Sequence, residues 1–420
     1  MTKFWLAGTA FVAVSAFASA AEAAPACDAD NGGLTLPKGF CAELIAHDLG
    51  TLRHITVAPN GDVYVGIQSR TGLGGGALGL RDTTGDGRLD TKVSFGEGST
   101  TGVGIYDGYV YLARTDSVVR FKLTPGQLKP TGAEEVVVSG MVAPSEHHDK
   151  GIAFDGKGAF YINVGPPSNA CQVKDRTKGS PGQDPCPLLP KFGGVWKFNA
   201  NKLNQTQADG DHTVTGLREA LAITYHDGAP YVVMNNRDQL DLLYPQYFTQ
   251  DDNNNRPAEV MYRGDPGSNF GWPYCFYDFK EQKLLLNPEY GGDGKKQGRC
   301  ATSGFGLPVA AFPAHWAPMA VTFYEGKQFP AHYRGGAFIA FHGSWNRAPQ
   351  ERPGAVVFQP FSGDKASGKF EIFASGFTKE PVPNQSAYTG RPNGVAVGPD
   401  GSLYVTDSVK GKIWRIFYKG

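Results

Sequence analysis

The sequence predicts an all-β fold, a six-bladed β-propeller with long inserted loops. Of the 420 residues, 56 are glycine and 29 are proline, and aromatic residues make up 12%. Helix formers dominate no long window, so this composition is typical of a turn-rich β protein. In addition, one pattern recurs six times: an alternating apolar strand, a tight Gly/Asp/Asn turn, and a second strand rich in Tyr and Val, which together predict a hairpin.

The repeated hairpins extend over most of the chain. They are predicted at 54–67, 102–114, 151–165, 221–235, 319–344 (with an inserted loop) and 394–408. A further strand is expected after several of them, in the segments VVRFKL, GVWKFNA, AVVFQPF and KIWRIFY. The mean period of about 60 residues exceeds that of common propeller repeats, which we attribute to long insertions. Two β-sandwiches are the alternative, but a sandwich has no need to repeat one motif so regularly.

The ends of the chain and its irregular stretches complete the expected domain. The two ends of a propeller usually meet in one blade, and KIWRIFY near the C-terminus is expected to supply the closing strand. We therefore expect one β-propeller domain over residues 27–420. The stretches 168–192 and 237–310 do not fit blades and are expected to be long loops, which in compact domains usually serve function.

The N-terminus has the pattern of a secretory signal peptide. Residues 1–20 contain a Lys, an apolar core shorter than a bilayer crossing, and the small-x-small sequence Ala18-Ser19-Ala20, with cleavage possible as late as residue 23. No later stretch is long and apolar enough to span a membrane. We therefore expect a periplasmic or secreted protein.

The cysteines agree with export. An even number in an exported chain predicts three disulfides, and sequential pairing is the preferred choice among fifteen: Cys27 with Cys41, Cys171 with Cys186, and Cys275 with Cys300. No CxxC or CxxCH is present, which argues against a zinc ribbon or a covalently attached haem. Any electron acceptor is therefore expected to be a separate molecule, a soluble cytochrome or a quinone.

The charge balance bears on the class of partner. Lys plus Arg and Asp plus Glu both number 40, so the formal net charge is zero, and no long basic run occurs. This argues against nucleic acid or an anionic membrane as the main partner and leaves a small molecule as the expected ligand.

The strongest candidate for chemistry is the segment Glu146-His147-His148-Asp149. It precedes the inner strand of the third hairpin, where a propeller loop opens towards the central channel. A histidine there could take a proton near neutral pH. The two adjacent rings point apart on an extended backbone, so they make a poor joint metal site. A solvated polar loop is the alternative explanation.

Other loops at the same level carry cations, amides and aromatic rings. Arg218 and Arg391 precede the fourth and last hairpins, and the segment FHGSWNRAP carries Asn346 and Arg347. The Gly-rich loop DPGSNFGWPYC carries Phe270 and Trp272. Arginines pair with carboxylates and aromatic faces stack on flat rings, so the set suits a planar, multiply anionic ligand. Ordinary blade packing and surface ion pairs are the alternatives.

Five of these segments together resemble a known family. SEHHDKGIAF, GLREALAI, SNFGWPYC, GGAFIAFHGSWNR and GRPNGVAVGPDGSLYVTD, in this order, are similar to the soluble glucose/sorbosone dehydrogenases. Those are periplasmic six-bladed propellers that use pyrroloquinoline quinone (PQQ) and Ca²⁺. The resemblance covers roughly residues 34–417 and is closest to the L-sorbosone dehydrogenase-like branch.

The resemblance implies roles for individual residues. His147 corresponds to the catalytic base and Arg218 to the arginine near the reactive quinone carbonyl, while Glu146 and His148 are expected to contact the substrate. The remaining cofactor-binding positions are Arg391, Asn346, Arg347, Trp272, Phe270 and Asn393. Asn346 replaces a lysine of the glucose-oxidising branch and Asn393 replaces an arginine, which puts the mode of quinone binding and glucose as the substrate in doubt. The family's backbone calcium site falls near Asn236 and Arg237, where its usual Gly-Pro is missing.

The segment RDTTGDGRLDT, residues 81–91, resembles a calcium loop. Asp82, Asp86 and Asp90 could supply oxygens, but the twelfth position counted from Asp82 is Val93 and not the usual glutamate. A plain turn between strands is the preferred interpretation.

Together these observations predict a PQQ-dependent dehydrogenase that oxidises an aldose or a sugar aldehyde by hydride transfer to the quinone. His147 is the expected general base, and Arg218 and Ca²⁺ are expected to stabilise the developing negative charge. The alternatives are a Ca²⁺-dependent sugar lactonase and a non-catalytic binding propeller, because fold alone does not imply activity.

Overall fold

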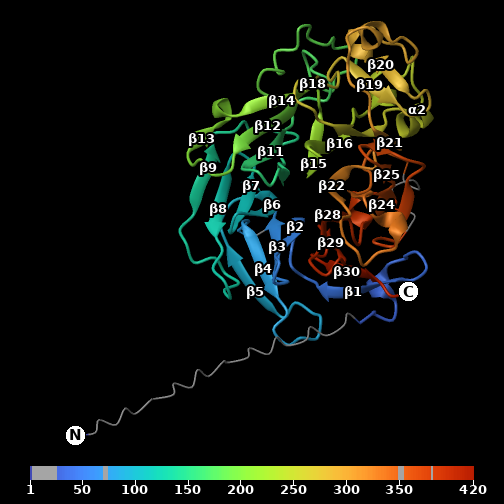
Figure 1. Cartoon of the computed structure of the whole chain (residues 1–420). Coiled ribbons are helices and arrows are strands. Elements are labelled where there is room, and N and C mark those ends of the chain that lie inside the picture. The colour runs from blue at the N-terminus through green and yellow to red at the C-terminus, as the bar shows by residue number, and fades with distance from the viewer. Residues whose placement is uncertain (2–25, 70–73, 349–353, 380–381) are drawn as a thin grey trace.

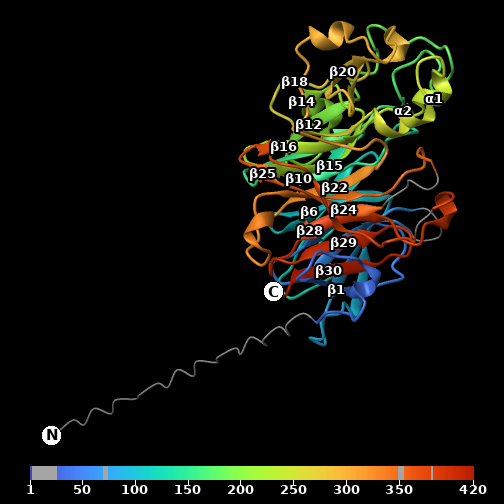
Figure 2. The ribbon, with the colours of Figure 1, turned by 90° about the vertical axis from the view of Figure 1, so that its right-hand side faces the viewer.

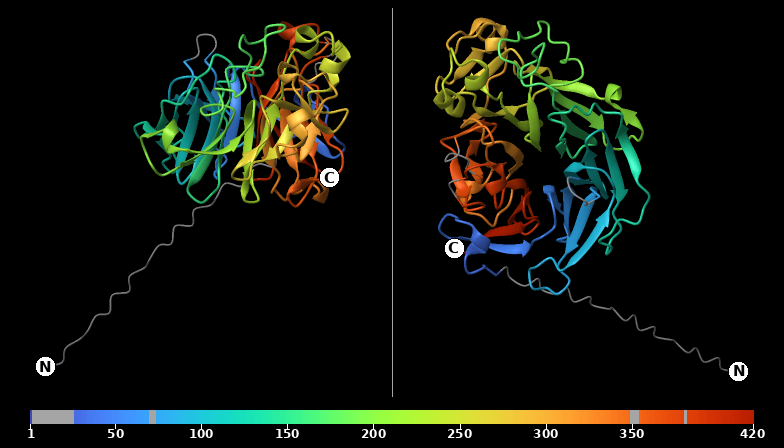
Figure 3. Two further views of the ribbon diagram at one scale, coloured as in Figure 1. Left: turned by 90° about the horizontal axis from the view of Figure 1, so that it is seen from above. Right: turned by 180° about the vertical axis from the view of Figure 1, so that it is seen from behind.

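The computed structural model describes Met1 and residues 26–69, 74–348, 354–379 and 382–420. Within this part of the chain, six mainly antiparallel sheets of four or five strands follow one another around a ring (Figures 1 and 3). The six-bladed β-propeller is therefore confirmed. The predicted signal peptide, apart from Met1, lies outside the described residues.

The first three blades each run from an innermost strand at the channel to an outermost strand at the rim. Blade 1 contains β2 (Leu52–Val57), β3 (Val63–Ile67), β4 (Ala77–Arg81) and β5 (Thr91–Phe95). Blade 2 contains β6 (Thr100–Tyr106), β7 (Tyr109–Arg114), β8 (Val118–Lys122), β9 (Glu135–Ser139) and β13 (Gln205–Thr206). Blade 3 contains β10 (Ile152–Phe154), β11 (Ala159–Val164), β12 (Gly194–Asn199), β14 (Asp211–Thr215) and β18 (Ser268–Asn269).

The other three blades have the same order. Blade 4 contains β15 (Glu219–His226), β16 (Ala229–Asn235), β17 (Glu259–Arg263) and β21 (Ala310–Phe312). Blade 5 contains β22 (Pro318–Phe323), β23 (Ala337–Phe341), β24 (Ala355–Gln359) and β27 (Glu371–Ala374). Blade 6 contains β28 (Pro392–Val397), β29 (Leu403–Asp407), β30 (Ile413–Tyr418) and β1 (Phe40–Ala46).

The six predicted hairpins form the two innermost strands of the six blades. Their turn chemistry explains why. Asp107 and Gly108, with φ of 47° and 76°, connect β6 to β7 in a two-residue turn of the kind that matches the twist of antiparallel strands. The innermost strands surround the channel, where residues of β2, β6, β10, β15, β22 and β28 line a common cavity. The loops that precede these strands therefore meet around one opening.

Ring closure differs in one respect from the prediction. The first and last strands of the described part of the chain do meet in blade 6. Within KIWRIFY, the residues after Lys412 form β30, the third strand of the blade. The closing outer strand is β1, which pairs with β30 from Phe40 opposite Tyr418 to Ala46 opposite Ile413. The closing strand was assigned wrongly from the sequence because β1 has no hairpin partner next to it in the chain.

The two stretches expected to be loops behave differently. No named strand lies in 168–192. The stretch 237–310 contains the blade strand β17, however, so its assignment as a loop is wrong. It also contains the hairpin β19 (Cys275–Asp278) and β20 (Lys283–Leu286) and the short helices α1 (Leu240–Leu243) and α2 (Gln250–Asn255). These additions gather at one edge of the ring, beyond blades 3 and 4 (Figures 1 and 2).

The hydrophobic core is divided among the interfaces between blades. Six clusters of buried residues each join two neighbouring blades, including blades 6 and 1. The cluster between blades 5 and 6 is rich in aromatic rings, with Phe40 of β1 packed edge-on against Phe329 at 4.8 Å and Phe373 at 5.0 Å. Because edge-to-face aromatic packing is favourable, this cluster helps to hold the closing strand in the ring.

Three disulfides confirm the sequential pairing of the cysteines: Cys27–Cys41, Cys171–Cys186 and Cys275–Cys300. Each closes a short loop, and loops of this size stabilise a fold by about 3 kcal/mol. Among the described residues, no helix has the length and apolar character needed to cross a bilayer.

Candidate functional site

A polar cavity of about 300 Å³ lies at the end of the channel where the innermost strands begin. This is the lower limit of the volume range of small-molecule pockets. Its lining includes five carboxylic acids, Glu146, Asp149, Glu219, Asp238 and Glu259. It also includes five basic residues, His147, His148, His315, Arg176 and Arg218.

His147 is held in one orientation by its surroundings. Its backbone is left-handed, with φ of 55°, and its Nδ1 lies 2.7 Å from the carbonyl oxygen of Pro166. A carbonyl can only accept, so Nδ1 carries the proton, and Nε2 of the neutral ring keeps its lone pair. A Cβ on Gly165 would lie 2.6 Å from both Cβ and the carbonyl oxygen of His147, so only glycine leaves this loop enough room.

His147 is also kept neutral. Its side chain is 8% exposed, and burial, followed by the nearby positive charge of Arg218, lowers its pKa well below 6.5. The nearest carboxylate, that of Glu146, is 3.9 Å from Nε2, beyond hydrogen-bond distance. At neutral pH the ring is therefore a proton acceptor at Nε2, as a general base requires.

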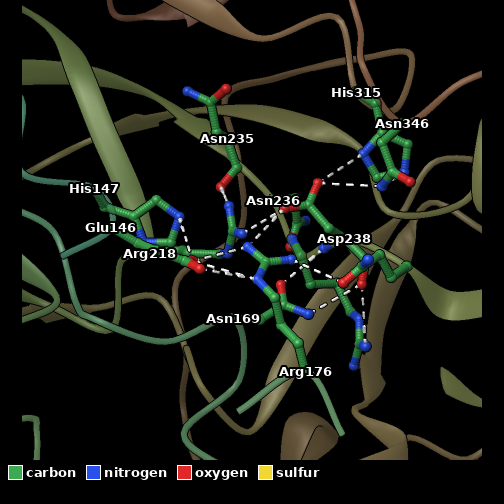
Figure 4. Close-up of polar contacts among 12 residues, drawn as sticks. Glu146, His147, Asn169, Arg176, Arg218, Asn235, Asn236, Asp238, His315 and Asn346 are labelled. Atoms are coloured by element: carbon green, nitrogen blue, oxygen red, sulfur yellow. Dashed lines mark hydrogen bonds and ion pairs between the residues drawn. The ribbon is translucent and has the colours of Figure 1, made fainter. Parts of the chain in front are cut away.

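Arg218 and Asp238 form the buried centre of the site (Figure 4). Arg218 Nη2 lies 2.6 Å from Asp238 Oδ2, and Arg218 Nη1 donates to the carbonyl of Asn235. Arg176 lies beside them and joins Asp238 at 3.3 Å to Glu146 at 2.9 Å. Burial would raise the pKa of the Asp238 carboxyl, but Arg218, His315 and Arg176 together hold it below its ordinary value. Asp238 is thus ionised and shared among several cations.

One donor of this centre has no partner. The Arg218 side chain is only 2% exposed, and its buried Nε makes no hydrogen bond to any described residue. Buried polar atoms are nearly always hydrogen-bonded, so an orphan beside a cavity needs an explanation. A bound anion or carbonyl oxygen would supply the missing acceptor.

Two further carboxyls have pKa values raised to neutral pH or above. Burial raises the pKa of Glu219 to about 7 and that of Glu259 to about 8. Glu259 also accepts a hydrogen bond of 2.9 Å from the backbone of Asn236. At neutral pH Glu259 is mainly protonated and Glu219 partly so. Because Glu146 and Asp238 are also paired with arginines, the cavity does not repel an anionic ligand as strongly as its five acids suggest.

His315 and Asn346 complete the far side of the centre. Asn346 Nδ2 lies 3.2 Å from Asp238 Oδ1, and His315 Nδ1 lies 3.5 Å from the same oxygen. Burial lowers the pKa of His315 to about 4, so this ring is neutral. Asn346 therefore orients Asp238, but it is not among the residues that line the cavity.

Several residues expected at the ligand lie elsewhere. Phe270 stacks on Tyr262 at 3.9 Å in the core. Trp272 packs on the Cys171–Cys186 disulfide, and its Nε1 donates to the carbonyl of Asn169. Both side chains are almost fully buried. The expected stacking of these two rings on a ligand must be corrected, because aromatic residues of a Gly-rich loop can equally fill space beneath it.

The other residues expected to bind the cofactor do not all lie at the cavity. Arg347 is buried, and its Nη1 donates to the carbonyls of Asn254 and Ala314. Arg391 lines a neighbouring cavity of about 430 Å³, which meets the first one at Gln68. Asn393 is fully buried, and its side-chain nitrogen and oxygen have no hydrogen-bond partner among the described residues. Of these three, only Arg391 lies where it could touch a ligand that extends from the first cavity.

The expected calcium position is only partly supported by its surroundings. Asn236 lines the cavity, but Arg237 turns away and binds Glu289 at 2.6 Å. A guanidinium has no acceptor for a metal, and Asn236 Oδ1 already accepts from the backbone of Arg237. Within the described part of the chain, no group of three His, Cys, Asp or Glu residues is gathered to hold a metal ion.

Sequence reasoning missed several residues of the cavity: Arg176, Glu219, Asp238, Glu259, His315 and Trp345. Trp345 is 44% exposed and lies within the motif FHGSWNR, beside the candidate residues Asn346 and Arg347. Arg176 lies in the stretch 168–192, where no repeat could indicate its position. The length of that stretch was the available signal.

The chain has recognisable relatives among known proteins. The family model described as TrAA12-like matches residues 34–419. The chain belongs to the TrAA12-like family. A pyrroloquinoline quinone-dependent pyranose dehydrogenase of Coprinopsis cinerea is 26% identical over 230 residues, 48% of this chain and 30% of that protein. An uncharacterized protein of Borreliella burgdorferi is 28% identical over 204 residues, 49% of this chain and 48% of that protein. The chain thus spans at most about half the length of these relatives.

Solved structures share the fold of this TrAA12-like protein. The iodide structure of the Trichoderma reesei family AA12 enzyme has a TM-score of 0.74 at 15% identity and covers 94% of this chain and 100% of its own. The holo form of the pyranose dehydrogenase PQQ domain from Coprinopsis cinerea has a TM-score of 0.72 at 19% identity, with coverage of 91% and 97%. The apo form of the Escherichia coli soluble aldose sugar dehydrogenase has a TM-score of 0.58 at 16% identity, with coverage of 90% and 99%. At these identities the likeness establishes the fold.

Proposed function

We propose that this TrAA12-like protein is an exported, PQQ-dependent dehydrogenase that oxidises an aldose or a related sugar aldehyde. The observation that carries the proposal is the neutral His147, whose Nε2 lone pair is unused beside Arg218 on the cavity. The printed names of the relatives support PQQ as the cofactor and a sugar as the substrate. L-Sorbosone is one substrate to test, in line with the resemblance noted from the sequence.

The residues of the cavity fit a flat, anionic quinone. The orphaned Arg218 Nε offers a hydrogen bond to an oxygen of the cofactor, and the half-exposed Trp345 offers an aromatic face. Arg176 adds a second guanidinium, and Arg391 in the adjoining cavity suits a distant carboxylate. Ca²⁺ is the expected companion ion, and backbone oxygens near Asn236 would help to hold it.

The role of the protein follows from the two groups at its centre. PQQ, when bound, supplies the acceptor for the hydride and the two electrons that leave the sugar C–H bond. His147 Nε2 takes the proton of the sugar hydroxyl, while the Pro166 carbonyl keeps the ring in the accepting tautomer. Arg218, held in place by Asp238, presents positive charge to the oxygen that becomes electron-rich. General-base help of this kind accelerates a reaction by about 10²–10⁴-fold.

The experiment is a titration of purified apo-protein with PQQ and Ca²⁺, followed by dye reduction with a panel of aldoses and L-sorbosone. Stoichiometric binding and sugar-dependent reduction are expected. His147→Ala should lower kcat by about 10²–10⁴-fold while PQQ still binds. His148→Ala, at the half-exposed neighbour, serves as the matched control and should lose far less. A large loss of turnover in the His148 variant alone would show that His148, and not His147, is the base. Absence of PQQ binding would refute the quinone proposal.

A sugar lactonase is the second candidate, because five acidic residues line the cavity, more than the sequence suggested. Its metal would need several of them together, yet Asp238 and Glu146 are paired with arginines. Hydrolysis of sugar lactones without PQQ would favour this candidate. PQQ or sugar binding without turnover would favour a binding propeller.

The natural electron acceptor of the proposed dehydrogenase is a separate soluble cytochrome or quinone.

A further inference from the structure

The proposed active site does not explain the acidic loop that connects β4 to β5 in blade 1. Strands β2, β3 and β4 alternate in direction, so the β4–β5 connection lies at the same end of the blade as the β2–β3 turn. Gln68, which follows β3, lies at the other end and lines the candidate cavity. The acidic loop is therefore on the opposite face of the propeller from the proposed active site, and its chemistry is independent of that site.

The spacing of oxygen-bearing residues in the loop matches a calcium-binding loop through its ninth position. Counted from Asp82, oxygens fall at positions 1, 3, 5 and 9, in the side chains of Asp82, Thr84, Asp86 and Asp90, and the backbone carbonyl of Arg88 falls at position 7. The sixth position, where such loops require glycine, is Gly87, with φ of 92°. What the loop lacks is the carboxylate of position 12, because residue 93 is valine.

A carboxylate from another blade lies against this loop. Glu43 of β1 is 2% exposed, and its Oε2 has no hydrogen-bond partner among the described residues. A Cβ placed on Gly87 would lie 2.9 Å from Oε1 and 3.0 Å from Oε2 of Glu43, so the carboxylate points directly at the sixth position of the loop. A buried carboxylate without a partner is costly unless an ion or donor completes its shell.

The surroundings of Glu43 carry an excess of negative charge. Burial raises the pKa of Glu43, Arg88 and Arg415 lower it, and Asp28 and Asp86 raise it by less than the arginines lower it. The nearby cations are Arg88, which is bound to Asp28 at 2.8 Å, and Arg415, which is bound to Asp400 at 2.8 Å. Both arginines thus already have a carboxylate of their own, so a divalent cation would offset the remaining charge.

The loop and β1 are already held together at their backbones. Leu89 donates from its backbone nitrogen to the carbonyl of Ile45 at 2.9 Å, and Arg88 Nη1 donates to the carbonyl of Leu44. The Cys27–Cys41 disulfide fixes Cys27 beside the same strand. Glu43 is therefore presented to the loop by a rigid element, as a metal ligand from a distant part of the chain must be.

We propose that the loop 82–90 and Glu43 together form a Ca²⁺ site, in which Glu43 replaces the carboxylate missing at position 12. Ca²⁺ is favoured because it accepts six to eight oxygen ligands in flexible geometry, including backbone carbonyls and water. The described side chains do not form a converged group of three metal ligands, and Asp82 and Asp90 accept hydrogen bonds within the loop. Binding therefore includes rotation of Asp86 and Glu43 towards the ion. The bound ion would link blade 1 to the closing strand of blade 6.

The test is Ca²⁺ binding by the purified, EDTA-treated full chain without PQQ, measured by calorimetry and by the shift in Tm. Wild type is expected to bind Ca²⁺ at this site and to unfold at a higher temperature when it is bound. Glu43→Gln keeps the shape of the side chain and removes its charge. This variant should lose one binding site or weaken it at least about tenfold, because the number of charged ligands sets the affinity.

Two more variants keep the result decisive. Asp86→Asn, in the exposed part of the loop, should weaken the same site even if the Glu43 variant folds poorly. Glu97→Gln, at an exposed acid that follows β5, should leave Ca²⁺ binding unchanged. Wild-type protein that binds no Ca²⁺, or a folded Glu43→Gln variant with unchanged stoichiometry and affinity, would overturn the proposal. PQQ-dependent sugar oxidation should persist in Glu43→Gln, so failure of this proposal is distinguishable from failure of the proposed function.

Discussion

Replacement of Asp238 by Asn should be among the most damaging single changes in the site. Asp238 accepts from Arg218 at 2.6 Å and from Arg176 at 3.3 Å, and its side chain is only 11% exposed. Removing one partner of a buried ion pair typically costs 3–5 kcal/mol, because the other charge is left uncompensated. The amide keeps one acceptor oxygen, which places the expected loss in the free energy of unfolding near the lower end, at about 3 kcal/mol.

The assay is urea unfolding of the wild type and the Asp238→Asn variant at several pH values. The folded pKa of Asp238 lies below its unfolded value. The stabilisation is therefore fully present above the unfolded pKa of about 3.9 and is lost as the pH falls towards the folded pKa. The difference between the two proteins should be constant above about pH 5 and shrink in more acidic solution. Asp364→Asn, at an exposed position, should change stability by less than about 0.5 kcal/mol. A loss below about 1 kcal/mol for Asp238→Asn at pH 7, or a difference that grows on acidification, would refute the reasoning.

Three further changes test the architecture around the base. Gly165→Ala should destabilise the fold by about 1–3 kcal/mol and lower kcat, because its Cβ would meet His147 at 2.6 Å; turnover and Tm measure this. Since the pKa of His147 is lowered and the neutral ring is the base, kcat/KM should not fall as the pH is lowered from 7.5 to about 6.5 and should fall only in more acidic solution. The double variant Cys171→Ser, Cys186→Ser should lose about 3 kcal/mol of unfolding free energy, measured without reductant.

Each of these three expectations has a contrary result. A Gly165→Ala variant with wild-type turnover would show that the loop can move without displacing the imidazole. An acidic limb of kcat/KM above pH 6.5 would show that the base titrates as an exposed histidine does. Unchanged stability of the double serine variant would show that closing the loop 171–186 contributes little to the free energy of unfolding.

The propeller could be predicted because its signals are local. Asp107 and Gly108 specify a turn between two residues and two strands without reference to the rest of the chain. Strand β17 was missed because the strand before it in the same sheet, β16, is separated from it by α1 and α2. β1 was missed as the closing strand for a related reason, since its partner β30 lies at the other end of the chain.

The site was predicted where it depends on the repeat and missed where it depends on packing. His147 and Arg218 stand before innermost strands of consecutive blades, so the fold alone brings them to one opening. Phe270 and Trp272 were assigned to the ligand because an aromatic ring in a loop has the same appearance in sequence whether it faces a cavity or fills the core. Asp238 could not be recognised without knowing that Arg218 lies beside it.

The closing of the ring by β1 has a consequence for the order of folding. Among the described strands, β1 precedes all others in the chain and its partner β30 follows all others, so this pairing closes a very long loop. Cys27 and Cys41 lie close in sequence and can join as soon as both have emerged, which gives the waiting strand a fixed shape. Until β30 arrives, neither edge of β1 is paired with a named strand, and the edge that β30 will cover is open to pairing with another chain. The arrival of β30 therefore decides whether β1 is paired within its own chain.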